Sequence, residues 1–308
     1  MFAPSRVTAL LVVLIASLCF STSGPLARMA APASPLLIAA ARTGIASLLL
    51  LGRAPLQSIA EVRRTSWPQR RVMLVAGLLL AGHFGFFLYG LATTSLAAAV
   101  TLVSLEPVAV VVAAALAFNE RPSTQAKIGI ALATLGAVIV AQGGGSGEHT
   151  LLGDLFVVIA VVLYGAYVMS ARRLAGAISA NAYAAVVFGT SAVSLAIVCG
   201  FAGVSLDIPA RSWWLIVALG VIPTLGGHTL VQWAVRWAPA SVVALVSPGE
   251  TLGSLAIAAV LMSLPPSPVE LMGAVVVRAG AVATLLAPAS ITPPGTPGAS
   301  SESGESDT

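Results

Sequence analysis

Hydrophobic positions form ten long runs along the chain, and short stretches with charged residues, prolines and glycines separate them. Most runs approach the roughly 20 residues that a helix needs to cross a hydrocarbon core of about 30 Å. The predicted spans are residues 7–27, 34–51, 72–91, 95–117, 125–141, 153–171, 180–202, 213–235, 239–262 and 268–287. The pattern predicts an all-α integral membrane protein with ten transmembrane helices.

The second half of the chain repeats the first at a displacement of 144 residues. The aligned pairs include Glu106 with Glu250, Arg28 with Arg172, Pro122-Ser123 with Pro266-Ser267, Gly129 with Gly273, and Gly136 with Gly280. A repeated glutamate inside an apolar run is improbable by composition alone. Internal duplication is typical of transporters. It predicts two five-helix repeats, residues 1–142 and 150–288, and a Pro, Gly, Ser and Thr-rich tail at 289–308 that we expect to be disordered.

Composition agrees with a membrane protein. Hydrophobic residues make up 58% of the chain, charged residues 8%, and the mean hydropathy is +0.99. A soluble globular domain carries roughly 25% charged residues, so that class is excluded. The net charge is +4, but the basic residues, nearly all Arg, lie singly or in pairs between apolar runs. This distribution indicates membrane topology and no nucleic-acid partner.

The basic residues also predict the orientation. If the N-terminus is cytoplasmic, eleven of the 15 basic residues fall in cytoplasmic segments and two, Arg28 and Arg211, lie outside. The positive-inside rule therefore places both termini in the cytoplasm, in a multi-pass protein of the cytoplasmic (inner) membrane. Because each repeat holds an odd number of spans, the two repeats are inserted in opposite directions, which is an inverted repeat.

The first apolar run could be read as the h-region of a secretory signal, because a short segment with Arg6 precedes it. The repeat argues against this interpretation. Its counterpart, Leu151 to Tyr164, is another apolar run in the middle of the chain. We therefore predict that the first run is the first membrane span.

Two glutamates are predicted deep within the membrane, where an unpaired charge is energetically costly. Glu106 and Glu250 are each about eleven residues into their predicted spans, roughly 16 Å deep and near the midplane. An ionised carboxylate there must face water, carry a proton or pair with a cation. Ser247 and Ser254 share the helical face of Glu250 and would line the same cavity. The alternative is a structural glutamate bonded to neighbouring backbone.

The eighth predicted span carries a polar stripe. Thr224, His228, Gln232 and Arg236 follow one another at spacings of four, so they share one helix face. The stripe fits a pathway lining. The alternative is that Arg236 sets topology while His228 and Gln232 bond to neighbouring helices. His83 in the third span is either a ligand contact or a packed histidine.

Two arginines are predicted within helices. Arg42 in the second span and Arg278 in the tenth each need a partner, which Glu106, Glu250 or a substrate carboxylate would supply. Glycines spaced by seven in the fifth and tenth spans, such as Gly129 and Gly136, would let these helices pack closely against neighbours.

Several short motifs resemble the EamA-type transporters of the drug/metabolite transporter superfamily, over roughly residues 7 to 288. They are Pro35 with Arg42, Leu91-Ala92-Thr93-Thr94-Ser95, Leu105-Glu106-Pro107, Asn119-Glu120-Arg121-Pro122 with Gly129 and Gly136, Trp237-Ala238-Pro239-Ala240-Ser241, and Gly249-Glu250. The resemblance implies ten helices in two inverted repeats around a central cavity, moving amino acids, other metabolites or toxic compounds without ATP. Three positions depart from the family pattern: Thr251 replaces a proline, Leu264 a glutamate, and Arg278 an apolar residue.

The leading hypothesis is a secondary active transporter, an exporter of a small metabolite, amino acid or drug by proton antiport. An uncoupled facilitator or importer is the alternative within transport, and a membrane sensor or enzyme is the alternative outside it. The chain has no phosphate loop, no His-Glu-x-x-His and no Cys-x-x-Cys, and Gly144-Gly145-Ser146-Gly147 falls in a linker, so no enzymatic activity is predicted. Cys19 and Cys199 lie in apolar runs, which predicts neither a disulfide nor a metal site. We expect no cofactor, a small-molecule substrate, the lipid bilayer as surroundings, and a monomer or homodimer.

Overall fold

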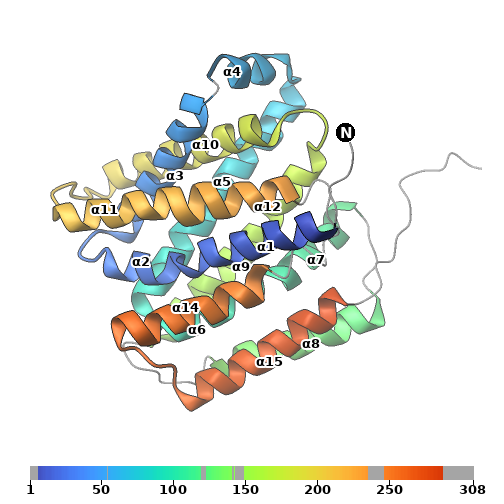
Figure 1. Cartoon of the computed structure of the whole chain (residues 1–308), viewed down its shortest axis with the longest axis vertical. Helices are drawn as coiled ribbons and strands as arrows, with labels where there is room; N and C mark the ends of the chain where they lie inside the picture. Colours follow the sequence, from blue (N-terminus) through green and yellow to red (C-terminus); the bar gives the residue numbers. More distant parts are fainter. Residues whose placement is uncertain are drawn as a thin grey trace, which may run out of the picture.

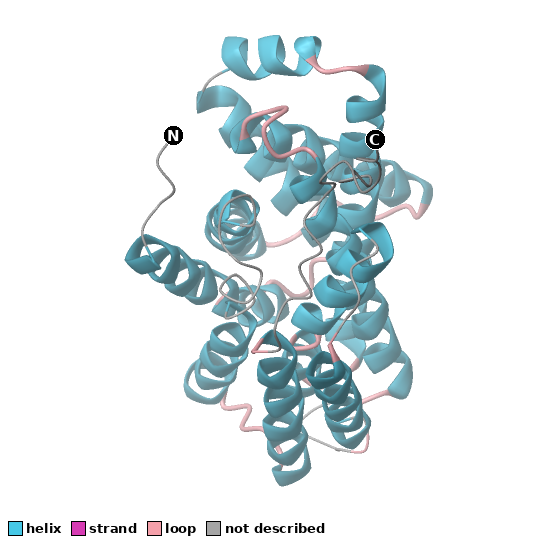
Figure 2. Ribbon diagram, turned by 90° about the vertical axis from the view of Figure 1, so that its right-hand side faces the viewer, coloured by secondary structure: helices cyan, strands magenta, loops and turns pink. Residues whose placement is uncertain are grey.

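The computed structural model describes residues 6–53, 55–118, 123–140, 142, 149–234 and 246–286, and every regular element in these ranges is helical (Figure 2). The elements are α1 (Arg6–Ser21), α2 (Ser23–Met29), α3 (Pro35–Arg53), α4 (Pro55–Arg64), α5 (Trp67–Thr93), α6 (Leu96–Val103), α7 (Glu106–Phe118), α8 (Thr124–Val140), α9 (Leu151–Arg173), α10 (Ala180–Phe201), α11 (Ala210–Leu219), the π-helix η1 (Gly220–His228), α12 (Thr229–Ala234), α14 (Val246–Met262) and α15 (Pro268–Leu285).

Helix is found in all ten predicted ranges. Six helical stretches are long and apolar enough to cross a membrane by themselves, among the described residues: Pro35–Arg53, Trp67–Thr93, Leu96–Ala117, Leu151–Arg173, Ala210–Ala234 and Ala180–Phe201. The helices α8 and α14 are apolar but shorter. The chain is therefore an all-helical, multi-pass membrane protein, and the count of ten spans stays a prediction.

Two elements were not predicted from the sequence. A short helix, α4, follows the second predicted span and ends in Arg63 and Arg64, so the basic connection is itself helical. The eighth span changes from α-helix to π-helix at Gly220–His228, where Pro223 lies inside the helix. Proline has no N–H to donate to the usual turn, and π-helical segments inside α-helices are frequent at functional sites.

The packing of the helices follows a pseudo-twofold pattern (Figure 1). Two pairs join a helix to its own counterpart in the other repeat, α3 with α10 and α8 with α15. The other pairs occur once in each repeat, with η1, α1 and α14 as the counterparts of α5, α9 and α7. The helix α5 packs on α9 as η1 packs on α1, and α7 packs on α9 as α14 packs on α1. This is the arrangement expected of two inverted repeats that share one interface.

The crossing of α8 and α15 shows the symmetry residue by residue. The glycines at this crossing are Gly129, Gly136, Gly273 and Gly280. A Cβ added to Gly136 would lie 2.9 Å from Cα of Val277, and one added to Gly280 would lie 2.7 Å from Cα of Ala133. The two contacts are related by the same displacement of 144 residues. The glycines therefore allow close packing, as predicted, and the two helices are each other's neighbours.

Several predicted features lie outside the described residues. These are the segment Asn119–Pro122, the linker with Gly143 to Gly147, the motif Trp237 to Ser241, Arg236, and the tail 289–308.

Candidate functional site

A small cavity lies between the two repeats. Its lining residues are Phe20, Ser23, His83, Phe84, Phe87, Val103, Glu106, Tyr164, His228 and Glu250. The volume accessible to water is about 20 Å³, which is room for about one water molecule. A metabolite-sized ligand needs several hundred Å³, so the cavity in this conformation is too small for one.

The cavity lies on the pseudo-twofold axis, because its lining residues pair across the repeat. Three pairs of lining residues are separated by 144 positions: Phe20 with Tyr164, Phe84 with His228, and Glu106 with Glu250. The duplicated halves therefore contribute equivalent positions to one site. Two of the pairs, Phe20 with Tyr164 and Phe84 with His228, differ in chemistry between the repeats, so the lining is not symmetric.

The span that carries Glu106 is broken at that residue. Pro107 cannot donate a backbone hydrogen bond to the carbonyl of Val103, and α6 ends at Val103. The N–H groups of Ser104 and Leu105 instead bond three residues back, at 3.0 Å each, and α7 begins at Glu106. The carboxyl group of Glu106 thus lies in the first turn of a half-helix, where unpaired N–H groups favour a negative charge.

Glu250 lies on α14, which runs from Val246 to Met262, and the part of the predicted ninth span before Val246 lies outside the described residues. Thr251 stands where the family pattern has proline, and α14 runs through it. The Thr251 hydroxyl donates to the carbonyl of Val100 at 3.0 Å and lies 2.5 Å from the Ser104 hydroxyl. These contacts join α14 to α6, the helix that precedes Glu106.

Arg42 is fully buried beside the cavity and does not line it. Its Nε donates to Thr224 at 2.8 Å, its Nη1 donates to Ser23 at 3.2 Å, and its guanidinium lies 4.3 Å from the ring centroid of Phe84. It forms no ion pair with Glu106 or Glu250 in the described structure. Hydroxyl groups and an aromatic face, not a carboxylate, are its direct partners.

His228 is enclosed by aromatic rings. Its ring centroid lies 4.8 Å from that of Phe20, 5.1 Å from Phe84 and 6.1 Å from Tyr164. Its Nδ1 is buried and has no hydrogen-bond partner among the described residues. The ring centroid of His83 lies 6.2 Å from that of His228, and His83 donates from Nδ1 to the carbonyl of Ala160 at 3.0 Å. His83 is therefore both a packed, bonded histidine and part of the cavity lining.

The other predicted site residues are not among the described lining residues. Gln232 is fully buried on α12. Ser254 donates its hydroxyl to the carbonyl of Ser21 at 2.8 Å, which joins α14 to α1. Arg278 is half-buried on α15, with its Nε and Nη2 unbonded to any described residue. The backbone of Ser247 belongs to α14, but its side chain lies outside the described part of the chain.

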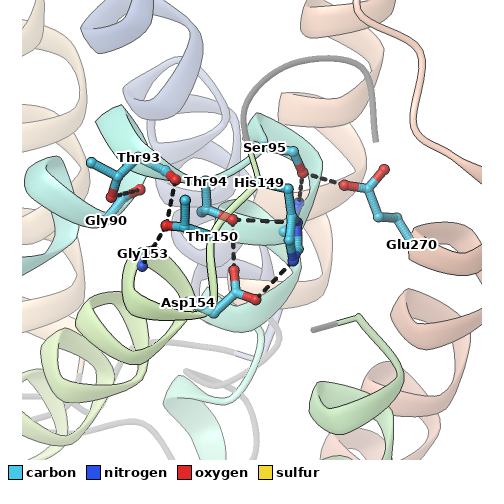
Figure 3. A network of polar contacts seen from close by, with 10 residues as sticks. Gly90, Thr93, Thr94, Ser95, His149, Thr150, Gly153, Asp154 and Glu270 are labelled. Carbon is cyan, nitrogen blue, oxygen red and sulfur yellow. Dashed lines mark hydrogen bonds and ion pairs between the residues drawn. The ribbon is translucent and has the colours of Figure 1, made fainter. Parts of the chain in front are cut away.

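A second polar cluster joins the repeats at the end of the bundle that we predict to face outward (Figure 3). We call it the outer network: Arg28, Thr94, Ser95, His149, Asp154 and Glu270. The Thr94 hydroxyl donates to Asp154 at 2.7 Å, and His149 forms an ion pair with Asp154 at 3.2 Å. Arg28 donates to the Thr94 carbonyl at 2.6 Å, and the Ser95 hydroxyl donates to Glu270. The contact of Thr94 with Asp154 joins the end of α5 to α9. The contact of Arg28 with Thr94 joins α2 to the end of α5, and the contact of Ser95 with Glu270 joins the start of α6 to α15.

The sequence interpretation did not identify Asp154, His149 or Glu270 as functional candidates. One signal was available for Glu270, because Ser267-Pro-Val-Glu270 has the spacing of a capping box. The structure has that box, with the Ser267 N–H donating to Glu270 at 2.7 Å and the Glu270 N–H donating to Ser267 at 3.2 Å. No comparable signal points from Asp154 to Thr94, since the contact depends on how α9 meets the end of α5.

Comparison with known proteins gives the family. One solved structure, described only as a crystal structure of a protein, has a TM-score of 0.65 and 23% sequence identity over 92% of this chain and 98% of its own, which shows a shared fold. No curated protein matches the chain. The model of the EamA-like transporter family matches twice, at residues 7–142 and 151–286. The two matches coincide with the two repeats and cover most of the chain, which therefore belongs to the EamA-like transporter family, a group of membrane transporters of the drug/metabolite transporter superfamily.

Proposed function

We infer that the protein is a secondary active exporter that moves a small metabolite, amino acid or drug out across the cytoplasmic membrane in exchange for protons. The observation that carries this proposal is the buried cavity on the pseudo-twofold axis, with Glu106 and Glu250 contributed by equivalent positions of the two repeats. Ionisable residues at such a depth mark substrate and ion pathways. Sites of secondary transporters lie at the interface of their repeats.

The outer network supports alternating access. Thr94 in the first repeat bonds Asp154 in the second, and Ser95 in the first bonds Glu270 in the second. Opening the cavity toward that end requires these contacts between the repeats to separate. A rocking motion of one repeat against the other does this while the central site stays in place. With both termini in the cytoplasm, this end is the outer face of the membrane.

The two glutamates are proposed to bind protons and substrate in turn. Neither carboxyl group forms an ion pair with a described residue, and both are nearly fully buried. The titratable and charged groups around them are Arg42, His83, Tyr164 and His228. An inward proton gradient would protonate the glutamates from outside, release bound substrate there, and return the proton to the cytoplasm.

The proposal is tested by comparing metabolites inside and outside cells that overproduce the wild type or the Glu106→Gln, Glu250→Gln double variant. A compound that accumulates outside only with the wild type identifies the substrate and supports export through the glutamates. The same profile for wild type, double variant and empty vector would contradict export of a common metabolite. Equal accumulation with wild type and double variant would contradict the role of the carboxylates.

A further inference from the structure

The π-helix η1 packs closely on two helices of the first repeat, one at each of its ends. At its start, a Cβ added to Gly220 would lie 3.1 Å from the carbonyl oxygen of Arg42 on α3. Near its end, a Cβ added to Gly227 would lie 2.6 Å from the ring of Phe20 on α1. The last residue of η1 is His228, which lines the cavity. The two close contacts therefore fix the helix that carries this imidazole.

A chain of hydrogen bonds joins α3 to the wide turn itself. In an α-helix the carbonyl of Leu219 would accept from residue 223, but Pro223 has no N–H to donate. The Thr224 hydroxyl donates to that carbonyl at 2.7 Å. The same hydroxyl oxygen accepts from Nε of Arg42 at 2.8 Å. The side chains of Arg42 and Thr224 are fully buried, so bulk water does not replace either bond. Arg42 thus acts on the backbone of the π-helix through one hydroxyl group.

Arg42 also supports the cavity wall from behind. Its Nη1 donates to Ser23 at 3.2 Å, its guanidinium lies 4.3 Å from the ring centroid of Phe84, and both residues line the cavity. The Phe84 ring lies in turn 5.1 Å from that of His228, in an edge contact. Arg42 therefore reaches the surroundings of His228 by two routes, one through Thr224 and one through Phe84.

The type of helix decides which way His228 faces. An N–H of a π-helix bonds the carbonyl five residues back, one residue more than in an α-helix. Each residue of an α-helix turns the chain by about 100°, so a return of η1 to α-helix would rotate His228 by about that angle. In the structure its ring centroid lies 4.8 Å from that of Phe20 and 6.1 Å from that of Tyr164. A rotated imidazole would leave these rings and the cavity.

We propose that Arg42 is a positioning residue of the transport site, which acts through Thr224 to hold the π-helix and, with it, the imidazole of His228 in the cavity wall. The imidazole is then a hydrogen-bonding group for a polar group of the substrate, because its buried Nδ1 has no partner among the described residues. The proposal rests on the proposed function, since His228 meets a substrate only if the cavity is the transport site.

NMR of the histidine rings tests the proposal, because the chain has only three histidines. The full-length protein with carbon-13-labelled histidine is purified in detergent, and His83→Gln, His149→Gln and His228→Gln assign the signals. The neighbouring aromatic rings should displace the His228 signal from that of an exposed histidine. Thr224→Val keeps the shape of the side chain and removes its hydroxyl, so it should change this displacement by at least half. Thr224→Ser restores the hydroxyl and should keep the wild-type signal.

Thr43→Val is the matched control. Thr43 is buried on α3 beside Arg42, but its hydroxyl donates to carbonyl groups of its own helix. This variant should leave the His228 signal in place. Arg42→Gln should move the signal as Thr224→Val does, which keeps the test decisive if size-exclusion chromatography shows that Thr224→Val is not folded. An unmoved signal in Thr224→Val or Arg42→Gln, a moved signal in Thr224→Ser, or an equal movement in Thr43→Val would overturn the proposal.

Extracellular metabolites of cells that overproduce these variants separate this proposal from the proposed function. Thr224→Val should lower export of the compound that the wild type exports by about fivefold, the size of one lost hydrogen bond, and Thr224→Ser and Thr43→Val should not. Unchanged export in Thr224→Val despite a moved His228 signal would overturn the role of His228 in transport. A His228 signal that responds as predicted, without export of any compound by the wild type, would keep the positioning by Arg42 and contradict the proposed function.

Discussion

Glu106 and Glu250 occupy equivalent positions in the two repeats but have different surroundings. Glu106 is the first residue of α7, after the break that accompanies Pro107 in its span. Glu250 follows the first turn of α14, which begins at Val246 and runs through Thr251. The two repeats therefore bring two carboxyl groups to one cavity from different positions in their helices.

The two repeats are symmetric where helices pack closely and asymmetric around the cavity. The crossing of α8 and α15 keeps the same glycine contacts in both directions, because backbone packing tolerates little change. Charged and aromatic positions around the cavity have diverged, with Arg42 facing Val186 in the alignment, and Phe84 facing His228. The close packing between the repeats is therefore symmetric, whereas the lining of the cavity is not.

Removing Arg42 should break this comparison most strongly. In Arg42→Gln, the hydrogen bonds that the guanidinium donates to Thr224 and Ser23 and its contact with the ring of Phe84 are lost. The variant should be less stable by about 2 to 3 kcal/mol, because buried hydroxyl groups lose a charged donor. Thermal unfolding in detergent measures it. Arg278→Gln is the matched control, since its Nε and Nη2 bond no described residue, and an equal loss of stability in the two variants would contradict the role of Arg42 in the cavity wall.

Equivalent glycines at the crossing of α8 and α15 should have equal effects on stability when they are replaced. Gly136→Ala and Gly280→Ala each place a Cβ against the backbone of the partner helix, so each should destabilise the protein by about 1 to 2 kcal/mol. Thermal unfolding in detergent gives the two values, which should agree. Gly52→Ala is the control, because a Cβ there meets no atom within 4 Å. Unequal effects of Gly136→Ala and Gly280→Ala would show that the scaffold shares the asymmetry of the lining.

The smallest effect is expected at Thr251. Thr251→Val removes the hydroxyl that bonds Val100 and Ser104 and should lower stability by about 1 kcal/mol. Thr134→Val is the control, because its exposed hydroxyl bonds only the carbonyl of Ile130 in its own helix. Thermal unfolding of both variants measures the difference. Equal stability of the two variants would mean that Thr251 does not join the glutamate-bearing spans.

Much of the fold could be predicted from the sequence. The apolar runs, the displacement of 144 residues and the glycines of α8 and α15 are local or repetitive signals, and they led to the helices, the repeats and the close crossing. The π-helix at Pro223 and the helix α4 were missed. A proline within an apolar run predicts a disturbance of the helix but not which kind, and α4 is too short for a membrane-span pattern.

The site was only partly predictable. Glu106, Glu250, His83 and His228 were identified because polar residues in apolar runs are conspicuous, and the structure brings all four to one cavity. That Arg42 bonds Thr224 and Ser23 and neither glutamate could not be predicted, because it depends on the packing of helices far apart in sequence. The outer network was missed for the same reason, since Asp154 bonds Thr94 across 60 residues.

The most direct test of the account is the comparison of metabolites outside cells that overproduce the wild type, Glu106→Gln, Glu250→Gln or the double variant. The account predicts a compound that accumulates outside with the wild type and not with the double variant, and less of it with each single variant. Equal accumulation with the wild type and the double variant would contradict the claim that the two carboxyl groups of the cavity carry the transport.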